Sequence, residues 1–394
     1  MADLSNQSVL GIKVEGTSGT YDAPNNSTDL VVVAELRPNI AGLTSQIQEF
    51  TGSIHQPGPT VSGATFEVTG RILLRGPGGS APPSADGFVP GRVLRAAGFS
   101  ETVISAAVPT SPEALAAATT TSVTLGSTAA GTADLYKAAA VLLAAVGSGF
   151  AGLTLLRSYT AGKLATVARV FGTAPTGNYQ VPRQLAYRLD ASGTPPTLSV
   201  SCWIGGKRYN GKGCTVSSLR IVLPTASRDN QDPPSIEFTL TGDLESDATE
   251  ACPSIAVPTV SPPPFRAGQL WIAGARLPAS NVTIDLGAEI AYEPNPNQAS
   301  GNNAAQLTRT TRTVNMTLSQ VSKATFDPFA LAAAQSLHGL SAIWGASAGN
   351  MIGLIVTDMR FNYPSPDNSG PLVNTTGEAY IDDANRSIGL VFVY

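Results

Sequence analysis

Charged and histidine side chains are scarce in this chain. Charged residues make up 13% of the 394 residues, aromatic residues make up 6%, and the chain has 2 histidines and 3 cysteines. Soluble domains usually carry about 25% charged residues. The net charge of −4 argues against a nucleic-acid binder that works by neutralising phosphates. A surface with so little charge is typical of a protein that covers much of itself with copies of itself.

The few residues suited to catalysis do not form a recognisable site. His55 lies in a Pro/Gly-rich loop, His338 follows a predicted helix, no Gly-x-Ser-x-Gly elbow is present, and neither His is at ligand spacing from another His or a Cys. Residues 206–212 have the glycine spacing of a phosphate loop, but Gly213 replaces the hydroxyl residue, so an exposed basic hairpin is the better interpretation. Glu289 or Glu293 could belong to a polysaccharide-cleaving pair, yet no second carboxylate stands at a predictable position. We therefore expect neither an enzyme nor a cofactor or metal site.

The cysteines and the N-terminus favour synthesis in a reducing cytoplasm. The first residues contain no basic region followed by an apolar core, so no secretory signal is expected. A hairpin with Asn210-Gly211 at its tip would place Cys202 opposite Leu219 and Cys214 opposite Lys207. The two cysteines would then not face each other, and we expect free thiols.

One uncharged run, 138–156, approaches the length of a membrane span. Ala and Gly dominate it and Gly147 interrupts it, so we interpret it as a packed helix over 134–146 and a strand over 150–157. No membrane span is expected. A second apolar strand is predicted over 164–171.

Gly (39) and Pro (29) are plentiful, which is typical of short strands joined by turns. Four segments alternate apolar and polar residues, as strands with one dry and one polar face do. Their apolar positions are Phe66, Val68, Ile72 and Leu74; Ile236, Phe238 and Leu240; Val282, Ile284 and Leu286; and Val314, Met316 and Leu318. Two short helices are predicted, one from Pro90 to Gly98 and one capped by Asp327-Pro328.

The C-terminal third of the chain repeats landmarks of the N-terminal half. The opening strands at Leu30 and Leu270, the helix starts at Phe88 and Phe326, and the tryptophans Trp203 and Trp344 occur in the same order. Such a duplication predicts two copies of one β-rich unit, and it favours a role in assembly over a role in catalysis.

The repeat divides the chain into five segments. An N-terminal arm covers 1–28. The first unit covers 29–99 plus 196–242, with 100–195 inserted as an outward-facing subdomain. A Pro-rich connector, 243–268, leads to the second unit, 269–394.

Two polar loops occupy corresponding places in the repeats, at 51–63 and 293–306. Such tips commonly become ordered against a partner, so we expect them to stack one ring on the next. The residues singled out are His55, Pro57, Pro59, Asn295, Asn297, Asn302 and Asn303.

The residues of three segments carry a family resemblance. Residues 11–21, 65–75 with the helix segment 91–99, and 235–242 resemble the opening strand, the strand-loop-helix and the closing strand of the tail tube (major tail) proteins of long-tailed, non-contractile bacteriophages. The likeness touches both copies, but its motifs concern packing rather than chemistry. The large insertion departs from the simplest members of that family.

This resemblance implies a mainly β (α+β) fold of two sandwich or partial-barrel units, each with one helix. The units would join edge to edge into a ring with one continuous inner β-barrel. Rings would stack in the virion tail on a tape-measure protein, between tail terminator and distal tail proteins, and double-stranded DNA would pass through the channel. A lumen without net positive charge would let DNA slide.

We expect the lumen-facing residues to be Glu67, Thr69, Arg71, Thr313, Asn315 and Thr317. With two units per chain, a trimeric, pseudo-hexameric ring is expected, and a hexameric ring stays open. Another virion or cell-surface structural protein, such as a decoration protein or adhesin, is the main alternative. A polysaccharide-degrading enzyme is a weaker one.

Overall fold

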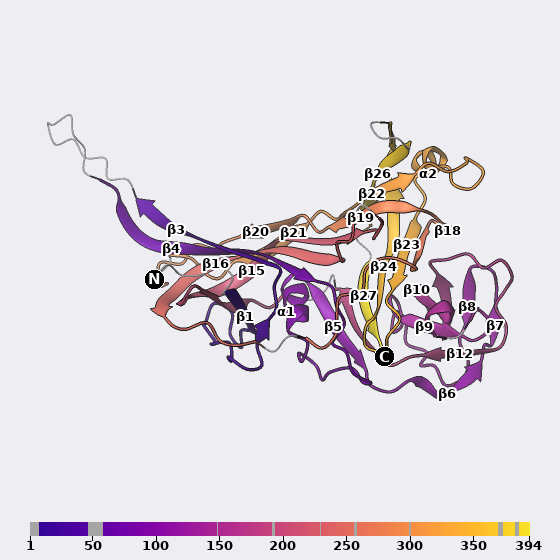
Figure 1. The fold of residues 1–394 in the computed structure, drawn as a ribbon, viewed down its shortest axis with the longest axis horizontal. Helices are drawn as coiled ribbons and strands as arrows, with labels where there is room; N and C mark the ends of the chain where they lie inside the picture. The colour runs from indigo at the N-terminus through magenta and orange to yellow at the C-terminus, as the bar shows by residue number, and fades with distance from the viewer. Residues whose placement is uncertain are drawn as a thin grey trace.

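The computed structural model describes residues 8–45, 58–147, 149–190, 194–228, 230–255, 258–298, 301–368, 373–382 and 386–394. The molecule is elongated and built mainly of strands, with two short α-helices in these ranges (Figure 1). The prediction of a mainly β chain is confirmed. Within these ranges, neither helix has the length and apolar character that crossing a bilayer requires.

One large antiparallel sheet runs through both halves of the chain. In one part of this sheet the strands alternate polar and apolar residues, so that part has one polar face and one face buried on the core. The four strands predicted by alternation are confirmed within it. In spatial order the strands are β3 (Glu35–Ser45), β4 (Thr60–Leu73), β16 (Ser235–Thr249), β15 (Lys207–Pro224), β19 (Ala279–Asp285), β22 (Thr313–Ser319) and β26 (Asn374–Ile381).

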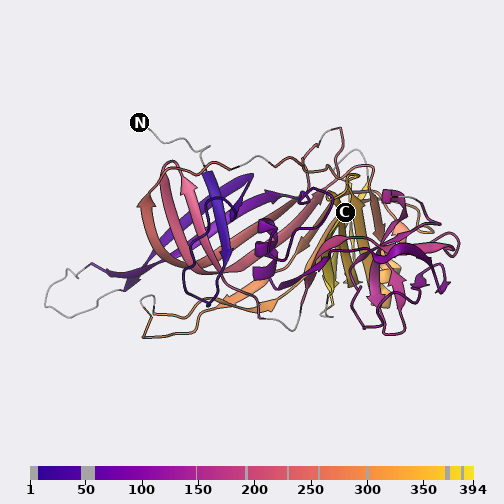
Figure 2. The same cartoon turned by 90° about the horizontal axis from the view of Figure 1, so that it is seen from below.

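The first unit closes behind this sheet into a half-barrel, which Figure 2 shows as a curved wall around α1. β15 pairs with β14 (Leu198–Ile204), and β14 pairs with β1 (Ser8–Val14). β1 in turn pairs with β2 (Leu30–Val31). The helix α1 (Val89–Ala96) fills the interior with Val93 and Leu94, both fully buried.

The second unit has a back layer that belongs to the same sheet, because β26 also pairs with β24 (Met351–Phe361). Its core strands are β17 (Gln269–Ile272) with β18 (Ala275–Arg276), β23 (His338–Trp344), β24 and β27 (Ile388–Val393). The sheet continues into β13 (Gln184–Leu189) and β5 (Phe99–Ile104), so the two ends of the 100–195 segment extend the second unit. α2 (Pro328–Ala334) lies against β24, and the short β25 (Ser365–Asp367) pairs with β26.

The rest of the 100–195 segment forms its own antiparallel sheet on the side of the molecule (Figure 1). It packs through β10 onto β24, with Gly353 and Gly389 leaving room for Leu155 and Ala138. Its strands are β6 (Val108–Ala114), β12 (Asn178–Val181), β9 (Ala140–Leu143), β10 (Leu153–Tyr159), β11 (Leu164–Val167), β8 (Ser122–Thr124) and β7 (Ala117–Ala118).

Both predicted helices are confirmed. Pro90 occupies the first turn of α1, and Gly98, at φ +92°, follows its end. The Asp327 carboxylate caps α2 by accepting the amide of Ala330 at 3.1 Å.

The predicted helix over 134–146 is wrong. Asp134 and Ala138 have positive φ values, the chain turns there, and Ala140–Leu143 form β9 between β10 and β12. Pairing on both sides overrides the helix propensity of the alanines. The strand predicted over 150–157 begins later, at Leu153, after a 3₁₀ turn (Gly149–Gly152), and the one predicted over 164–171 ends at Val167.

The hairpin predicted at Asn210-Gly211 is also wrong. β14 and β15 turn at Gly205-Gly206, both at positive φ, so Cys202 faces Tyr209 and Cys214 faces Leu198. Gly211 is needed for packing instead, because a Cβ there would lie 2.1 Å from the Phe66 ring. The cysteines are nevertheless free, as predicted.

Candidate assembly surface

The segments predicted as the first and second units are joined edge to edge within one chain. β15 of the first unit pairs with β19 of the second, from Arg220 opposite Asp285 to Pro224 opposite Asn281. The sheet therefore continues without a break from β3 to β26, and its polar sides face the same way. We call this surface the polar face.

The six residues predicted to line a channel lie on the polar face. Glu67, Thr69 and Arg71 project from β4, and their cross-strand partners on β16 are Thr241, Thr239 and Glu237. Residues directly opposite each other in a sheet point to the same side. Following the same rule through β15 and β19 leads to Thr313, Asn315 and Thr317 on β22. Thr69 and Asn315 are exposed, and the other four are half-buried.

Charges alternate in sign along one row of the polar face. The row crosses five strands through directly opposed residues: Glu35, Arg71, Glu237, Arg220 and Asp285. The Arg71 and Glu35 side chains are 3.9 Å apart, and Arg220 lies 3.8 Å from Glu237 and 3.3 Å from Asp285. Each exposed pair is worth at most about 1 kcal/mol. The larger effect is that the arginines are neutralised locally.

The row continues on the second unit with fewer charges. Asp285 faces Thr313, Thr313 faces Tyr380, and Tyr380 faces Arg360. Arg360 is paired with Asp382 at 3.3 Å. Among the described residues, each arginine of the row thus has a carboxylate within 4 Å.

Sequence reasoning missed most of this row. Arg220 alternates with Leu219, Ile221 and Leu223, and Glu237 stands between Ile236 and Phe238. Alternation places Glu237 on the polar side of its strand, and the same period-two signal could have placed Arg220 there as well. Their opposition to Arg71 and Asp285 depends on long-range pairing that the sequence does not reveal.

The polar face has two open edges. In the part of the chain that the structure describes, β3 pairs only with β4, and β25 pairs only with β26. An unpaired edge exposes backbone N–H and C=O groups that can bind another strand. Apolar side chains are exposed beside both edges: Ile40 (40%) and Val61 (69%) on the β3–β4 hairpin, and Tyr363 (62%) before β25. That hairpin projects from the molecule (Figure 1).

Hydrogen bonds among its own side chains connect the described residues of the second predicted stacking loop. It joins β20 (Ala288–Ala291) to β21 (Gln306–Thr310), which lie against β15. Asn295 Nδ2 donates to Asn303 Oδ1 at 2.7 Å, and Asn303 Nδ2 donates to Glu293 Oε2 at 2.8 Å. Asn297 is exposed at the tip, and Asn302 bridges to Pro294. The prediction that this loop is mobile in a free subunit stays a prediction.

The first predicted stacking loop can be placed only in part. His55 and Pro57 lie outside the described residues, whereas Pro59 is exposed just before β4. The two loops lie in different hairpins, one at the tip of β3–β4 and the other between β20 and β21.

Among the described residues, those weighed for catalysis are not brought together. His338 Nε2 lies 2.8 Å from Ser336 Oγ, and burial together with the Arg157 charge lowers the pKa of this histidine. Glu293 accepts the Asn303 amide, and residues 206–212 belong to the β14–β15 hairpin and β15 rather than a strand-loop-helix. Across the described ranges, no group of His, Cys, Asp and Glu has metal-site geometry.

Comparison with known proteins identifies no family for this chain. The chain matches no protein-family model, and it matches no curated protein.

Proposed function

We propose that this chain is a structural subunit of a bacteriophage tail tube, located in the virion, and that its polar face lines the channel for double-stranded DNA. The observation that carries the proposal is the β15–β19 junction. At this junction one unit's sheet continues edge to edge into the next and keeps its polar side on one surface. Pairing the remaining edges in the same way between chains would extend that surface into a closed wall.

The charge distribution supports passage of DNA. A wall rich in unpaired Lys and Arg would bind phosphates and release counterions, which would hold the DNA in place. On the polar face each arginine of the charged row is neutralised by a neighbouring carboxylate. Thr69, Thr239, Asn315 and Thr317 add uncharged groups, which give no electrostatic attraction to the phosphates.

We propose further that three chains close one ring. Each chain supplies two units, so three chains supply six, with the β15–β19 junction repeated inside each chain and a β3-to-β25 junction between chains. Symmetry would then be threefold, and only approximately sixfold. Other partners would be the rings above and below, a tape-measure protein, and the terminator and distal proteins of the tail.

Electron microscopy of the purified chain tests this proposal. We expect hollow tubes whose averaged rings show three outward lobes, each formed by one 100–195 segment. Six identical lobes per ring, each with the mass of a whole chain, would replace the three-chain ring by a six-chain ring. Discrete particles without a channel, at any concentration tried, would favour a decoration protein or adhesin and overturn the tube.

A loop deletion tests stacking separately. Removing Asn295–Asn303 leaves Ala304, which packs beside Gly213, and should give a folded subunit that no longer forms long tubes. Ordering a loop costs about 1–2 kcal/mol per residue, which a neighbouring ring would have to offset. Deleting Gly172–Ala174, an exposed stretch of the side sheet, is the control and should leave tube length unchanged. Tubes of normal length from the first variant would remove this loop from the stacking contact.

A further inference from the structure

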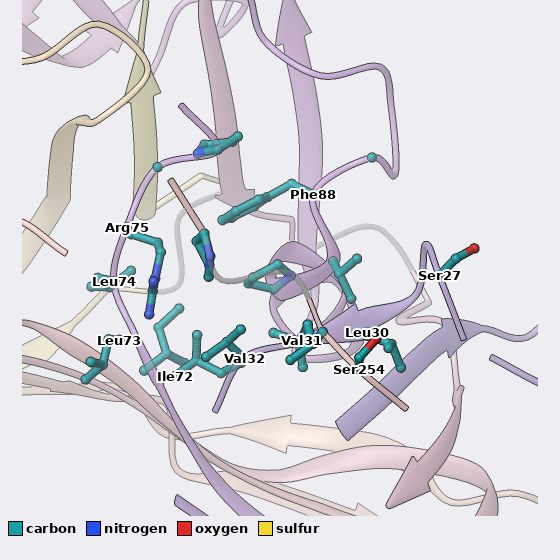
Figure 3. Close-up of a pocket in the computed structure, with 18 residues that line it drawn as sticks. Ser27, Leu30, Val31, Val32, Ile72, Leu73, Leu74, Arg75, Phe88 and Ser254 are labelled. Carbon is teal, nitrogen blue, oxygen red and sulfur yellow. The ribbon is translucent and has the colours of Figure 1, made fainter. Parts of the chain in front are cut away.

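A largely apolar cavity of about 340 Å³ lies between β2, the end of β4, the start of α1 and the segment around Ser254 (Figure 3). Val31, Ile72, Leu74, Phe88, Pro90 and Ile255 contribute to its walls. Ile72, Val32 and Val31 form an apolar floor, with Arg75 at one side and Leu30 and Ser254 at the other. Ile72 points to the core side of β4, opposite to the polar face.

Arg75 is the one charged residue among those described that line this cavity. No described residue forms a hydrogen bond or ion pair with it, whereas Arg71, Arg92, Arg157 and Arg220 each have a carboxylate partner. Arg75 is part-buried, and this burial lowers the pKa of its guanidinium. A partly desolvated cation without a partner is unfavourable, and an anion placed beside it would relieve that cost.

The size of the cavity limits what can enter. At about 30 Å³ per water molecule in the liquid, it holds roughly eleven waters, or a ligand with a similar number of non-hydrogen atoms. Apolar walls with one convergent polar group are the usual composition of a small-molecule site. The shape and the single cation together specify a ligand with an apolar chain and one anionic end.

We propose that this cavity binds a small amphipathic carboxylate, with the carboxylate on the Arg75 guanidinium and an alkyl chain of roughly eight carbons along Ile72, Val32 and Val31. An arginine and a carboxylate form paired, charge-assisted hydrogen bonds, which neutral or cationic head groups cannot form. This activity is separate from ring assembly and does not depend on it.

Calorimetric titration of the full chain with octanoate, octanol and octylamine tests the site. Octanoate should bind the wild type at least tenfold more tightly than octanol, and octylamine should bind most weakly. Arg75→Gln should weaken octanoate about tenfold and leave octanol unchanged. The matched control is Arg37→Gln, which removes an arginine whose side chain is 80% exposed on β3, and it should not alter binding.

A second variant locates the alkyl chain. Ile255→Trp should fill the cavity and abolish binding of both octanoate and octanol, with the fold checked by circular dichroism. The inference fails if octanoate shows no binding at millimolar concentration, binds no better than octanol, or binds Arg75→Gln as well as the wild type. Full octanoate binding by a folded Ile255→Trp variant would place the ligand elsewhere and overturn the site.

Discussion

The Arg220 guanidinium lies 3.3 Å from the Asp285 carboxylate, across the junction of the two units. Arg220 faces Glu237 of the first unit on one side and Asp285 of the second unit on the other. One side chain thus contacts acidic groups of both units, at the place where their sheets become one.

This pair should be weak and sensitive to salt. Both side chains are partly exposed, at 48% and 33%, so solvent screens their attraction. A double-mutant cycle with Arg220→Ala and Asp285→Ala should give a coupling of about 0.5 kcal/mol in the free energy of unfolding, and less in about 1 M salt. Urea denaturation measures it. A coupling above about 2 kcal/mol would show that the junction is far drier than the exposed fractions indicate.

Docking of the side sheet should depend on Gly389. A Cβ at this position would lie 2.6 Å from the Cβ of Ala138, which cannot rotate away. We expect Gly389→Ala to lower the free energy of unfolding by about 1–3 kcal/mol through overpacking. Gly377→Ala on β26 is the matched control and should cost little, because a Cβ there would lie 4.0 Å from the nearest atom outside its chain neighbours. Equal stabilities of the two variants in urea would contradict the close packing of β27 on the side sheet.

The buried ion pair of Arg92 should matter more than any surface pair. Arg92 Nη1 lies 2.8 Å from Asp29 and also donates to the Ile12 carbonyl, which ties α1 to β1. Arg92→Met leaves Asp29 buried without its partner and should cost about 3–5 kcal/mol. Arg95→Met removes a more exposed arginine that pairs with Asp86, and should cost under about 1 kcal/mol. Chemical denaturation of both variants measures the loss in free energy of unfolding. Similar losses would mean that Arg92 contributes no more to stability than Arg95.

Low pH should weaken the same ion pair between Arg92 and Asp29. Burial of Asp29 opposes its ionisation, but the Asn25 amide and Arg92 outweigh it and hold the pKa of Asp29 below its ordinary value of 3.8. A carboxyl with a depressed folded pKa stabilises the fold above its unfolded pKa and loses that contribution as the pH falls through the folded value. The stability difference between wild type and Asp29→Asn should therefore shrink below about pH 4. A difference that stays constant from about pH 6 to about pH 3 would contradict the ionised pair.

The side sheet should contain a second acid-sensitive group. The Ser127 hydroxyl, the Thr128 amide and the Tyr179 hydroxyl donate to Glu113 and lower its pKa from 4.5 to about 2. Because the folded pKa is depressed, the ionised Glu113 carboxylate stabilises the fold above pH 4.5. This contribution is lost as the pH falls from 4.5 to about 2. The Tm difference between wild type and Glu113→Gln should narrow across that window.

Local patterns predicted four strands of the large sheet and both helices. Alternation around Phe66, Phe238, Ile284 and Met316 identified four strands, because one polar and one buried face impose a period of two. Asp327-Pro328 predicted the start of α2 through capping chemistry alone. The same patterns placed the six candidate channel residues on polar sides of their strands.

Tertiary contacts explain what the patterns missed. The alanines at 138–140 favour a helix by propensity, but Ala140 and Val141 pair with β10 instead. Asn210-Gly211 is a strong turn signal, yet the Asn210 side chain accepts from Tyr21 and donates to Ser246, and Gly211 accommodates Phe66. The junction between Arg220 and Asp285 joins residues 65 positions apart (285 − 220), a pairing that no local signal encodes.

The position of β13 between β5 and β27 has a consequence for synthesis. Gln184 pairs with Val393, so β13 waits for a partner made 209 residues later (393 − 184). At about 5–20 residues per second on the ribosome, that delay is roughly 10–40 s. During this time the nascent chain carries an open strand that could pair with another chain on the same messenger. A chaperone that holds nascent β13 would thus raise the yield of correctly folded subunits without altering their final stability.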